Sequence, residues 1–437
     1  MLKIFNTAQN KKINFIPINK DNIKMYVCGP TVYDYIHIGN ARPIIVFDVL
    51  YRLLLSIYPS VKYVRNITDI DDKINTKALQ NNETIFELTK RTENQFIKDY
   101  TNLNAITPNV EPRATEHIDE MIEMIQQLIE DEHAYESNKH ILFRVKSWSE
   151  YGKFANKNYD EQVHGARVEI ANYKEDPADF VLWKPSTDNE PSWNSPWGKG
   201  RPGWHIECSA MIKKHLGENF DIHGGGLDLI FPHHQNEIAQ SCCANKSNKF
   251  ANYWMHNGFL MSEGQKMSKS LGNFYTVNEL LNEFSGNAIR LVLLSTHYRK
   301  PLDFTKSKLV EAEHLINKLS DFINKNKNKN DKQDENIDEF KNTLYDDLNT
   351  PLAISIIWKY QKEKQINKLL KSIELLGFDI KISEKNEIPQ EIKELAEKRK
   401  QAKLEKKFIE SDEIRNKIKQ LGYEIKDTPS GYEINKI

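Results

Sequence analysis

The sequence predicts an α/β protein: a parallel-sheet domain with an insertion, followed by a helical region. Three observations support this prediction. Short apolar strands alternate with helices up to about residue 110, which is typical of a parallel sheet. Between about residues 111 and 200 a Trp- and Pro-rich stretch interrupts that alternation. After Ser270 the apolar spacing becomes helical.

The first strand and helix enclose a polar loop. Residues 23–28 form a predicted buried strand. Apolar residues from Ile44 to Leu54 recur at helical spacing, and Pro43 is tolerated in a first turn, where its missing N–H is not needed. His37 and Asn40 therefore lie at a helix N-terminus, where free N–H groups and the helix dipole attract anions. A capping or packing role is the alternative for the histidine.

The next elements lead into the insertion. Residues 61–67 form a second predicted strand, and residues 116–131 a helix followed by a hairpin region. We interpret residues 111–200 as an insertion between two halves of the sheet. The tryptophans between Trp183 and Trp197 are predicted to be packing residues.

Three segments are expected to converge at one edge of the sheet. Cys28 and Thr68 each end a predicted strand, and Gly224–Gly226 forms a predicted turn after the insertion. Open parallel sheets bind ligands beyond the carboxyl ends of their strands, at a switch in strand order. The sequence therefore predicts a site where these segments meet.

A second phosphate-binding candidate is Lys266-Met267-Ser268-Lys269-Ser270, which lies between Gly264 and Gly272. Lysine ammonium groups neutralise phosphate oxygens, while serine hydroxyls and backbone N–H groups donate hydrogen bonds to them. Alone, such a segment fits a solvated surface loop equally well. The anion-attracting helix terminus at His37 favours a triphosphate-binding loop.

Four cysteines in 437 residues do not form a disulfide framework, and no secretory signal precedes them. We therefore expect a cytoplasmic protein with reduced thiols. A helix predicted to begin just after Pro232 places His233 and Glu237 on one face, at positions i and i+4. Cys242 and Cys243 face elsewhere on that helix and are predicted to be small buried residues.

Cys28 and Cys208 remain as possible partners of His233 and Glu237. The four form a Cys₂HisGlu set that is compatible with tetrahedral zinc. Zinc ligands usually occur as close pairs, whereas these are scattered, so the spacing alone leaves ordinary packing roles open.

The formal net charge is −1, so any nucleic-acid contact must come from a local basic patch. Lys398, Arg399, Lys400 and Lys403 crowd one predicted helix near the C-terminus, enough to contact several phosphates. A solvated helix face is the alternative. Residues 325–336 lack apolar anchors and are predicted to be a flexible connection. No apolar run is long enough to span a bilayer, so no membrane partner is expected.

His37-Ile38-Gly39-Asn40 and the lysine-serine loop resemble the two signatures of class I aminoacyl-tRNA synthetases, the first of which usually ends in histidine. The whole chain resembles the cysteinyl-tRNA synthetases, from Met25–Asp34 through Asn66–Lys73 to the C-terminus. This resemblance implies a class I Rossmann-like catalytic domain. We expect a first catalytic half over residues 1–110, a connective insertion over 111–200 and a second catalytic half with the zinc site over 201–260. These are followed by a mobile ATP loop with a stem-contact region over 261–305, a helical bundle over 306–385 and an anticodon-binding domain over 386–437.

The resemblance also implies roles for individual residues. The implied ligands of one zinc ion per chain are Cys28, Cys208, His233 and Glu237. The implied ATP-binding residues are His37, Asn40, Gly225, Asp228, Lys266, Ser268 and Lys269, of which His37, Asn40, Lys266 and Lys269 are catalytic. The implied cysteine pocket is Gly29, Thr68, Trp204, His223 and Asp228. The implied tRNA contacts are Lys398, Arg399, Lys400 and Lys403.

The implied activity is that of an ATP-dependent cysteine–tRNA ligase, with L-cysteine, ATP with Mg²⁺, and tRNA(Cys) as partners, and we expect a monomer. Zinc with an open position would bind the substrate thiolate, where an apolar pocket would separate cysteine from serine by only about 1–3 kcal/mol. Two departures stand out. Asn40 can donate a hydrogen bond but carries no charge. The family's C-terminal tryptophan is absent, with Glu433 and Ile434 in its place.

Two other functions remain open at this point. One is a related cysteine ligase whose acceptor is an amino sugar, although such an enzyme would lack the basic C-terminal domain. The other is a catalytically silent zinc- and RNA-binding regulator, which would have little physical need for both Lys266 and Lys269.

Overall fold

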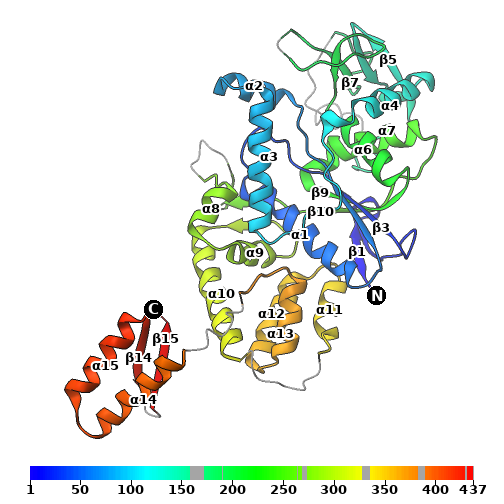
Figure 1. Cartoon of the computed structure of the whole chain (residues 1–437). Helices are drawn as coiled ribbons and strands as arrows, with labels where there is room; N and C mark the ends of the chain where they lie inside the picture. Colours follow the sequence, from blue (N-terminus) through cyan, green and yellow to red (C-terminus); the bar gives the residue numbers. More distant parts are fainter. Residues whose placement is uncertain are drawn as a thin grey trace. The chain divides into compact units, whose positions relative to one another are not determined.

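The computed structural model describes residues 1–157, 172–188, 190–262, 264–267, 273–326, 335–381, 389–428 and 431–436. It divides the chain into two compact units, Met1–Ile380 and Lys381–Ile437. Figure 1 shows the elements coloured along the sequence. Among the described residues, no helix is both long enough and apolar enough to span a membrane. The finer division into six parts stays a prediction.

A four-stranded parallel sheet of order β10-β9-β3-β4 lies at the centre of the first unit. Its strands are β3 (Ile23–Val27), β4 (Val61–Arg65), β9 (Phe220–Gly226) and β10 (Ala251–Asn257). Helix α1 (Ile38–Leu55) connects β3 to β4, whereas β9, on the other side of β3, follows the insertion. The strand order therefore switches between β3 and β9. The predicted α/β class and parallel sheet are confirmed.

Helix α1 packs closely on this sheet because its side chains are apolar and one sheet position is glycine. Phe47 of α1 is fully buried in the same core as Met25 and Ile222. A Cβ atom at Gly224 would lie 2.2 Å from the Phe47 ring. Only glycine at this position lets the helix approach the carboxyl end of β9.

Four further helices accompany the sheet domain, namely α2 (Asp72–Asn81), α3 (Ile85–Asn102), α6 (Ile206–Leu216) and α7 (Gln235–Ala244). Short helical turns cover Thr7–Gln9, Ala114–Glu116, Val145–Ser147, Leu227–Leu229 and Ile230–His234. A hairpin of β1 (Lys3–Asn6) and β2 (Lys11–Asn14) forms the N-terminus.

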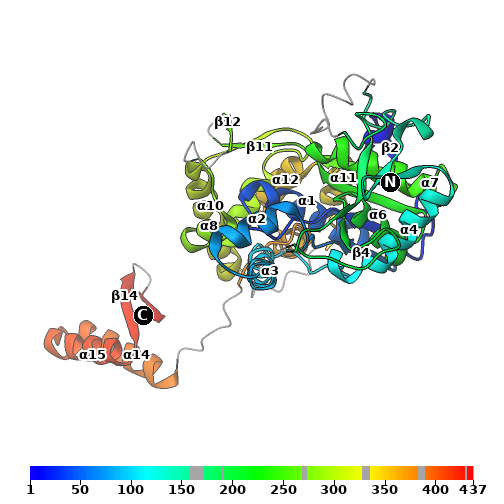
Figure 2. The ribbon, with the colours of Figure 1, turned by 90° about the horizontal axis from the view of Figure 1, so that it is seen from above.

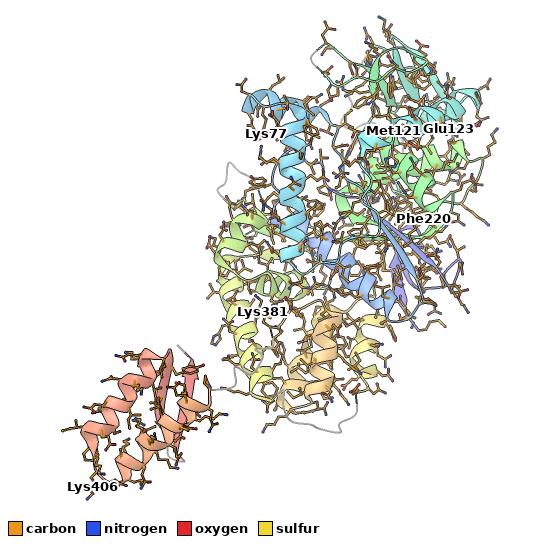
Figure 3. The ribbon with its side chains drawn as sticks, in the orientation of Figure 1. Lys77, Met121, Glu123, Phe220, Lys381 and Lys406 are labelled. Carbon is orange, nitrogen blue, oxygen red and sulfur yellow. The ribbon has the colours of Figure 1, made fainter. Side chains whose placement is uncertain are left out.

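The insertion contains α4 (Ile118–Glu130) and an antiparallel sheet of β5 (Ala134–Ser137), β6 (His140–Phe143), β7 (Phe180–Pro185) and β8 (Gly200–Pro202). Helix α4 is amphipathic, with Met121 buried and Glu123 exposed (Figure 3). It is slightly shorter than predicted, because a separate turn precedes it. Trp183 is buried in the insertion core, as predicted for a packing residue.

After β10 the chain forms a small sheet and a set of helices. The sheet contains β11 (Leu260–Ser262), β12 (Gln265–Lys266) and β13 (Leu302–Phe304). The helices are α8 (Val277–Glu283), α9 (Gly286–Leu294), α10 (Lys306–Asn326), α11 (Asp338–Tyr345), α12 (Thr350–Lys362) and α13 (Ile366–Leu375). Most of the predicted connection 325–336, namely residues 327–334, lies outside the described residues.

The second unit contains two packed helices, α14 (Gln390–Leu404) and α15 (Phe408–Gln420), and a hairpin of β14 (Tyr423–Thr428) and β15 (Gly431–Lys436). Figure 2 shows this helix pair with β14 beside it. Its own small core consists of Ile392, Ala396, Ile418, Tyr423 and Ile425.

Candidate active site and metal centre

The first turn of α1 is closed by its own signature residues. His37 is the N-cap residue, and its Nδ1 accepts a hydrogen bond from the Gly39 N–H at 3.1 Å. Asn40 Oδ1 accepts one from the His37 N–H at 3.2 Å, which completes a capping box. The asparagine at position 40 therefore contributes an amide acceptor to the start of the helix.

The lysine-serine loop leaves the small sheet and reaches this turn. The backbone of Lys266 pairs in β12 with Met261 of β11. A Cβ atom at Gly39 would lie 3.3 Å from Met267 Cε, so Met267 lies directly beside the first turn of α1. Ser268 and Lys269 lie outside the described residues.

The chain returns from that loop along the same part of α1. The Ile38 N–H donates to the Tyr275 carbonyl at 3.0 Å, and the Val277 N–H donates to the Ile36 carbonyl at 2.9 Å. Both described flanks of the loop thus meet the N-terminus of α1. Met267, in the described part of one predicted phosphate-binding segment, therefore lies beside the other, the turn that contains His37 and Asn40.

Cys28, Cys208, His233 and Glu237 form a buried cluster whose ligand atoms all lie within 4.8 Å of one another. Cys28 Sγ is 4.0 Å from Cys208 Sγ and 3.5 Å from Glu237 Oε1. His233 Nε2 is 3.6 Å from Cys208 Sγ and 2.8 Å from Glu237 Oε1. The structure therefore assembles all four predicted ligands at the switch between β3 and β9.

This cluster has the size and chemistry of a tetrahedral zinc site. Zinc bonds of about 2.3 Å to sulfur and about 2.0–2.1 Å to nitrogen require separations of about 3.8 Å between two sulfurs and about 3.6 Å between sulfur and nitrogen. The observed Cys28–Cys208 and Cys208–His233 separations are 4.0 and 3.6 Å. Two thiols with an imidazole and a carboxylate are also donors that suit zinc. The residues present fit the ion.

The helix predicted to begin just after Pro232 is confirmed. Phe231 has an extended backbone with φ −138° and ψ 133°, and the helical turn that contains His233 and His234 continues directly into α7 at Gln235. His233 and Glu237 meet at positions i and i+4, as their 2.8 Å contact shows.

Two further imidazoles, those of His223 and His234, contact residues of the cluster. His223 Nε2 lies 2.6 Å from Glu237 Oε2, and His234 Nε2 lies 3.4 Å from Cys28 Sγ. These residues form an overlapping group, Cys28, His223, His234 and Glu237, that could also hold a metal. Of the two, the first contains both thiols and suits zinc better.

Three of the histidines here were missed by sequence reasoning. His205 Nδ1 lies 2.9 Å from His233 Nδ1, and His234 Nδ1 lies 2.8 Å from His256 Nε2. Each thereby fixes the ring of a candidate ligand or of its neighbour. The doublet His233-His234 was the one local signal of such a cluster.

Burial and neighbouring side chains shift the pKa values of the residues in the cluster. A hydrogen bond from Cys28 lowers the pKa of the Cys208 thiol to about 6, which favours a thiolate at neutral pH. Burial raises the pKa of Glu237, but His223 and His233 outweigh it and hold that pKa well below its usual value. A thiolate and a carboxylate within one buried cluster favour a cation between them.

Of the residues predicted for the cysteine pocket, one contacts the exposed side of this cluster and another contacts its buried side. The indole of Trp204 is 42% exposed and stacks on His233, with ring centroids 4.5 Å apart. Thr68 Oγ1 donates to Glu207 Oε2 at 3.3 Å. His223, by contrast, is fully buried and contacts Glu237, so it orients a candidate ligand.

Backbone geometry explains the glycines of this region. A Cβ atom at Gly29 would lie 1.7 Å from the Asn66 carbonyl oxygen, so only glycine fits between the ends of β3 and β4. Gly225 lies at the end of β9, where a Cβ atom would approach the His234 ring to 3.0 Å. Asp228 is exposed just beyond it.

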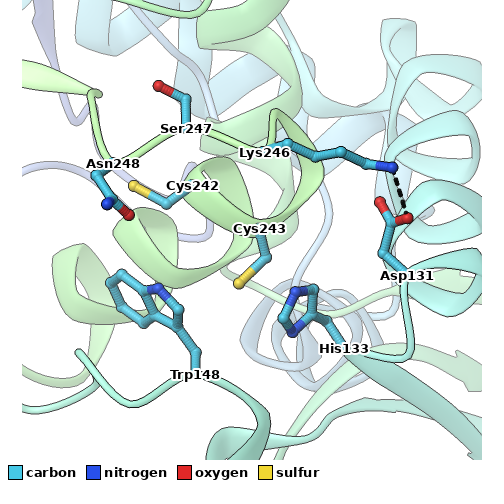
Figure 4. A pocket seen from close by; sticks show the side chains of 8 residues that line it. All are labelled: Asp131, His133, Trp148, Cys242, Cys243, Lys246, Ser247 and Asn248. Carbon is cyan, nitrogen blue, oxygen red and sulfur yellow. Dashed lines mark ion pairs between the residues drawn. The ribbon is translucent and has the colours of Figure 1, made fainter.

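Cys242 and Cys243 lie away from the metal cluster, as predicted. They line a separate pocket of about 370 Å³ with His133, Trp148 and the ion pair between Lys246 and Asp131 (Figure 4). Burial raises the pKa of both thiols to about 12, so they stay protonated.

The basic residues of α14 have different surroundings. Arg399 is buried, and its two Nη atoms donate to the Asp427 carboxylate at 2.9 and 3.0 Å. Lys403 Nζ donates to the same carboxylate at 2.7 Å. Lys398 and Lys400 are exposed on this helix. Arg399 is therefore buried against Asp427, whereas the two lysines are exposed and Lys400 pairs with Glu397 at 3.0 Å.

Comparisons with known proteins agree with this geometry. Residues 14–314 match the family model described as the tRNA synthetases class I (C) catalytic domain. The chain is 48% identical to a cysteine–tRNA ligase from Rhodospirillum rubrum, over 98% of both chains. It is 46% identical to one from Saccharophagus degradans, over 100% of both.

A solved structure shows the same fold at low identity. Methionyl-tRNA synthetase from Mycobacterium tuberculosis, in complex with methionyl-adenylate, superposes with a TM-score of 0.60 at 15% identity. The match covers 82% of this chain and 89% of that one. The class I synthetase fold is therefore confirmed. This chain belongs to the family of cysteine–tRNA ligases, ATP-dependent enzymes among the class I tRNA synthetases.

Proposed function

We propose that this chain activates L-cysteine with ATP and transfers it to the terminal adenosine of tRNA(Cys), selecting its substrate with zinc held by Cys28, Cys208, His233 and Glu237. The observation that carries the proposal is the Cys₂HisGlu cluster at the end of β3. The family supplies the reaction, and the cluster supplies a physical reason for cysteine as its substrate.

Activation requires no protein nucleophile. A carboxylate oxygen of cysteine forms a bond to the α-phosphorus of ATP, and the bond from that phosphorus to the bridging oxygen breaks. Pyrophosphate leaves with the electron pair. The enzyme accelerates this step by positioning the reactants and by stabilising charge on the leaving group.

In this proposal the N-terminus of α1 faces the phosphates. The positive end of its dipole favours anions. The predicted free N–H groups are paired, the Ile38 N–H with the Tyr275 carbonyl and the Gly39 N–H with His37 Nδ1. His37 and Asn40 shape that turn, and Lys266 and Lys269 supply charge for the β and γ phosphates, with Mg²⁺ accompanying the nucleotide. Gly225 and Asp228 lie near the adenosine.

The metal cluster recognises the side chain of the substrate. A bound zinc ion would supply a soft Lewis acid for the substrate sulfur, which stabilises a thiolate and discriminates against the hydroxyl of serine. Trp204, stacked on His233, covers this side of the site. Gly29 and Thr68 line the adjacent strand ends.

In the transfer step the 2′-hydroxyl of the terminal adenosine attacks the carbonyl carbon of the adenylate. The ester bond forms, the bond to phosphate breaks, and AMP leaves. The C-terminal unit, with exposed Lys398 and Lys400, is proposed to contact the tRNA.

Cobalt replacement tests the selection of the thiol directly. Cobalt in a site with two cysteine ligands gives near-ultraviolet thiolate-to-metal charge-transfer bands and visible d–d bands, and both change when a further sulfur binds. We expect L-cysteine to perturb this spectrum and L-serine to leave it unchanged. The proposal fails if the loaded protein shows no spectral change with cysteine.

A further inference from the structure

We propose that Arg42 is a positioning residue for the ATP reaction: its guanidinium holds the strands that lead to Lys266 against the helix whose N-terminus carries His37. The reaction in this inference is that of the proposed function. The set of contacts made by the Arg42 side chain, which we call the clamp, is argued from the geometry alone. Arg42 does not touch the substrate in this account. It sets the spacing of the two segments that do.

The guanidinium of Arg42 is fully buried and bridges two separate chain segments. Its Nη1 donates to the carbonyl oxygens of Gly258 and Phe259 at 2.7 and 3.0 Å. Its Nη2 donates to those of His297 and Lys300 at 3.2 and 2.7 Å. One side chain therefore fixes four carbonyl groups, two on each segment.

This cation is buried without a counter-ion. Among the residues that the structure describes, no carboxylate lies within ion-pair distance of Arg42, and only carbonyl dipoles face its two terminal nitrogens. Burial lowers the pKa of the guanidinium to about 10, so it remains charged at neutral pH. A buried unpaired charge is costly, and an apolar side chain would fill this space at lower cost. What an apolar side chain would not supply is the fixed fork of donors.

The two clamped segments lead into the small sheet that carries the loop. Gly258 and Phe259 precede β11, in which Met261 pairs with Lys266. The second segment precedes β13, which pairs with β11 in parallel. The Gly258 N–H also donates to the Tyr298 carbonyl at 2.7 Å, so the two segments are joined where Arg42 holds them.

The return side of the loop is held by backbone hydrogen bonds of Ile38 with Tyr275 and of Val277 with Ile36, and by the ring contact of His37 with Phe274. Both described flanks are thus fixed on residues 36–42. The approach side depends on the Arg42 side chain, so substitution of Arg42 should release that side. A displacement of about 1 Å between catalytic groups can cost about 100-fold in rate.

Arg42→Lys is the informative substitution. It keeps the charge and most of the volume, but a single ammonium nitrogen cannot span two pairs of carbonyl groups. Arg290→Lys is the matched control. Arg290 is also fully buried and also donates to backbone carbonyls, those of Leu376 and Leu103, but it has a counter-ion in Asp48, farther along α1.

Single-turnover adenylate formation is measured in both variants at saturating cysteine, with cysteine affinity read from the cobalt spectrum. We expect Arg42→Lys to slow adenylate formation about 100-fold and to weaken ATP binding about 10-fold, with cysteine affinity changed less than twofold. Arg290→Lys should lose stability and stay within about threefold of the natural rate. Equal rate losses in the two variants would overturn the positioning role.

Hydrogen exchange provides a readout that does not depend on the substrate. In Arg42→Lys the amides of residues 258–262 and 298–304 should exchange at least about 10-fold faster, while those of α7 stay unchanged. Unchanged exchange in those two segments would overturn the clamp. If the natural protein binds ATP but does not activate cysteine, the proposed function fails, whereas exchange and ATP affinity in the two variants still decide the role of Arg42.

Discussion

At Glu237 the two carboxylate oxygens have different partners. Oε1 faces His233 and Cys28, as a ligand atom would, and Oε2 lies 2.6 Å from His223 Nε2. His223 was predicted to line the cysteine pocket, but its ring is fully buried and stacks on Trp254 at 4.4 Å. Its position is that of a residue that orients a metal ligand.

Replacing His223 by alanine should therefore weaken zinc binding by about 10- to 100-fold, because Glu237 loses the partner that fixes its rotamer. Competition with a chromogenic chelator measures this affinity. Cys242→Ser is the control, since Cys242 is buried away from the cluster and should bind zinc normally. Equal zinc affinity in the His223→Ala variant and the natural protein would contradict the assignment.

A different buried carboxyl group predicts a pH dependence of stability. Asp99 of α3 is fully buried, and Gln95 Nε2 donates to its Oδ1 at 2.7 Å. Burial raises the pKa of this carboxyl to about 6. The unfolded chain ionises Asp99 near pH 4, so the folded state loses stability as the pH rises from about 4 to about 6.

Asp99→Asn removes that ionisation. At pH 7.5 the variant should be more stable than the natural protein by the order of 1–3 kcal/mol, and the difference should shrink as the pH falls below about 5. Urea unfolding at pH 7.5 and pH 4.5 measures both differences. A gain in stability that is equal at the two pH values would show that ionisation is not its cause.

Among the elements, the start of α1 combines a structural and a chemical role. Asn40 accepts a hydrogen bond from the His37 N–H, and the same turn faces the loop that contains Met267. Two substitutions separate the roles. Asn40→Ala removes the acceptor, whereas Asn40→Asp keeps it and adds a negative charge where phosphates are proposed to bind.

We expect Asn40→Ala to lower the free energy of unfolding by about 1 kcal/mol, while Asn40→Asp keeps it, because an acidic residue suits a helix N-terminus. ATP–pyrophosphate exchange should fall at least about 10-fold in Asn40→Asp through repulsion of the triphosphate. Urea unfolding and exchange kinetics are measured on both. Exchange at the natural rate in Asn40→Asp would contradict phosphate binding at this turn.

The sequence predicted the elements that can be recognised from the spacing of their own side chains. The strand before Cys28, the long apolar helix after Pro43 and the pairing of His233 with Glu237 all follow from spacing. The clamp at Arg42 did not, because its four acceptors are backbone carbonyls, which have no sequence signature. The extended conformation of Phe231 agrees with a local rule, because the residue before a proline is disfavoured in the helical region.

At the scale of the whole molecule, the two compact units have separate cores, and their proposed tasks can be separated by mutation. Arg399 is buried against Asp427, so reversing its charge would disturb folding. Lys398 and Lys400 are exposed and can be reversed with little effect on the core.

The double variant Lys398→Glu and Lys400→Glu should lower tRNA charging at least about 10-fold and leave cysteine-dependent pyrophosphate exchange unchanged. The salt dependence of charging should become shallower. Lys362→Glu, at an exposed position of α12, serves as the control for a charge reversal in the first unit. Loss of exchange together with charging would indicate that the second unit also affects activation.

The central claim concerns which amino acid is activated and what accepts it. Zinc-loaded protein is incubated with ATP, Mg²⁺ and total tRNA, and both pyrophosphate exchange and charging are measured with labelled cysteine and with labelled serine. The account predicts exchange and charging with cysteine and at least about 100-fold less of each with serine. Comparable activity with serine would contradict selection by the metal cluster, and exchange without charging would show that the acceptor is not tRNA.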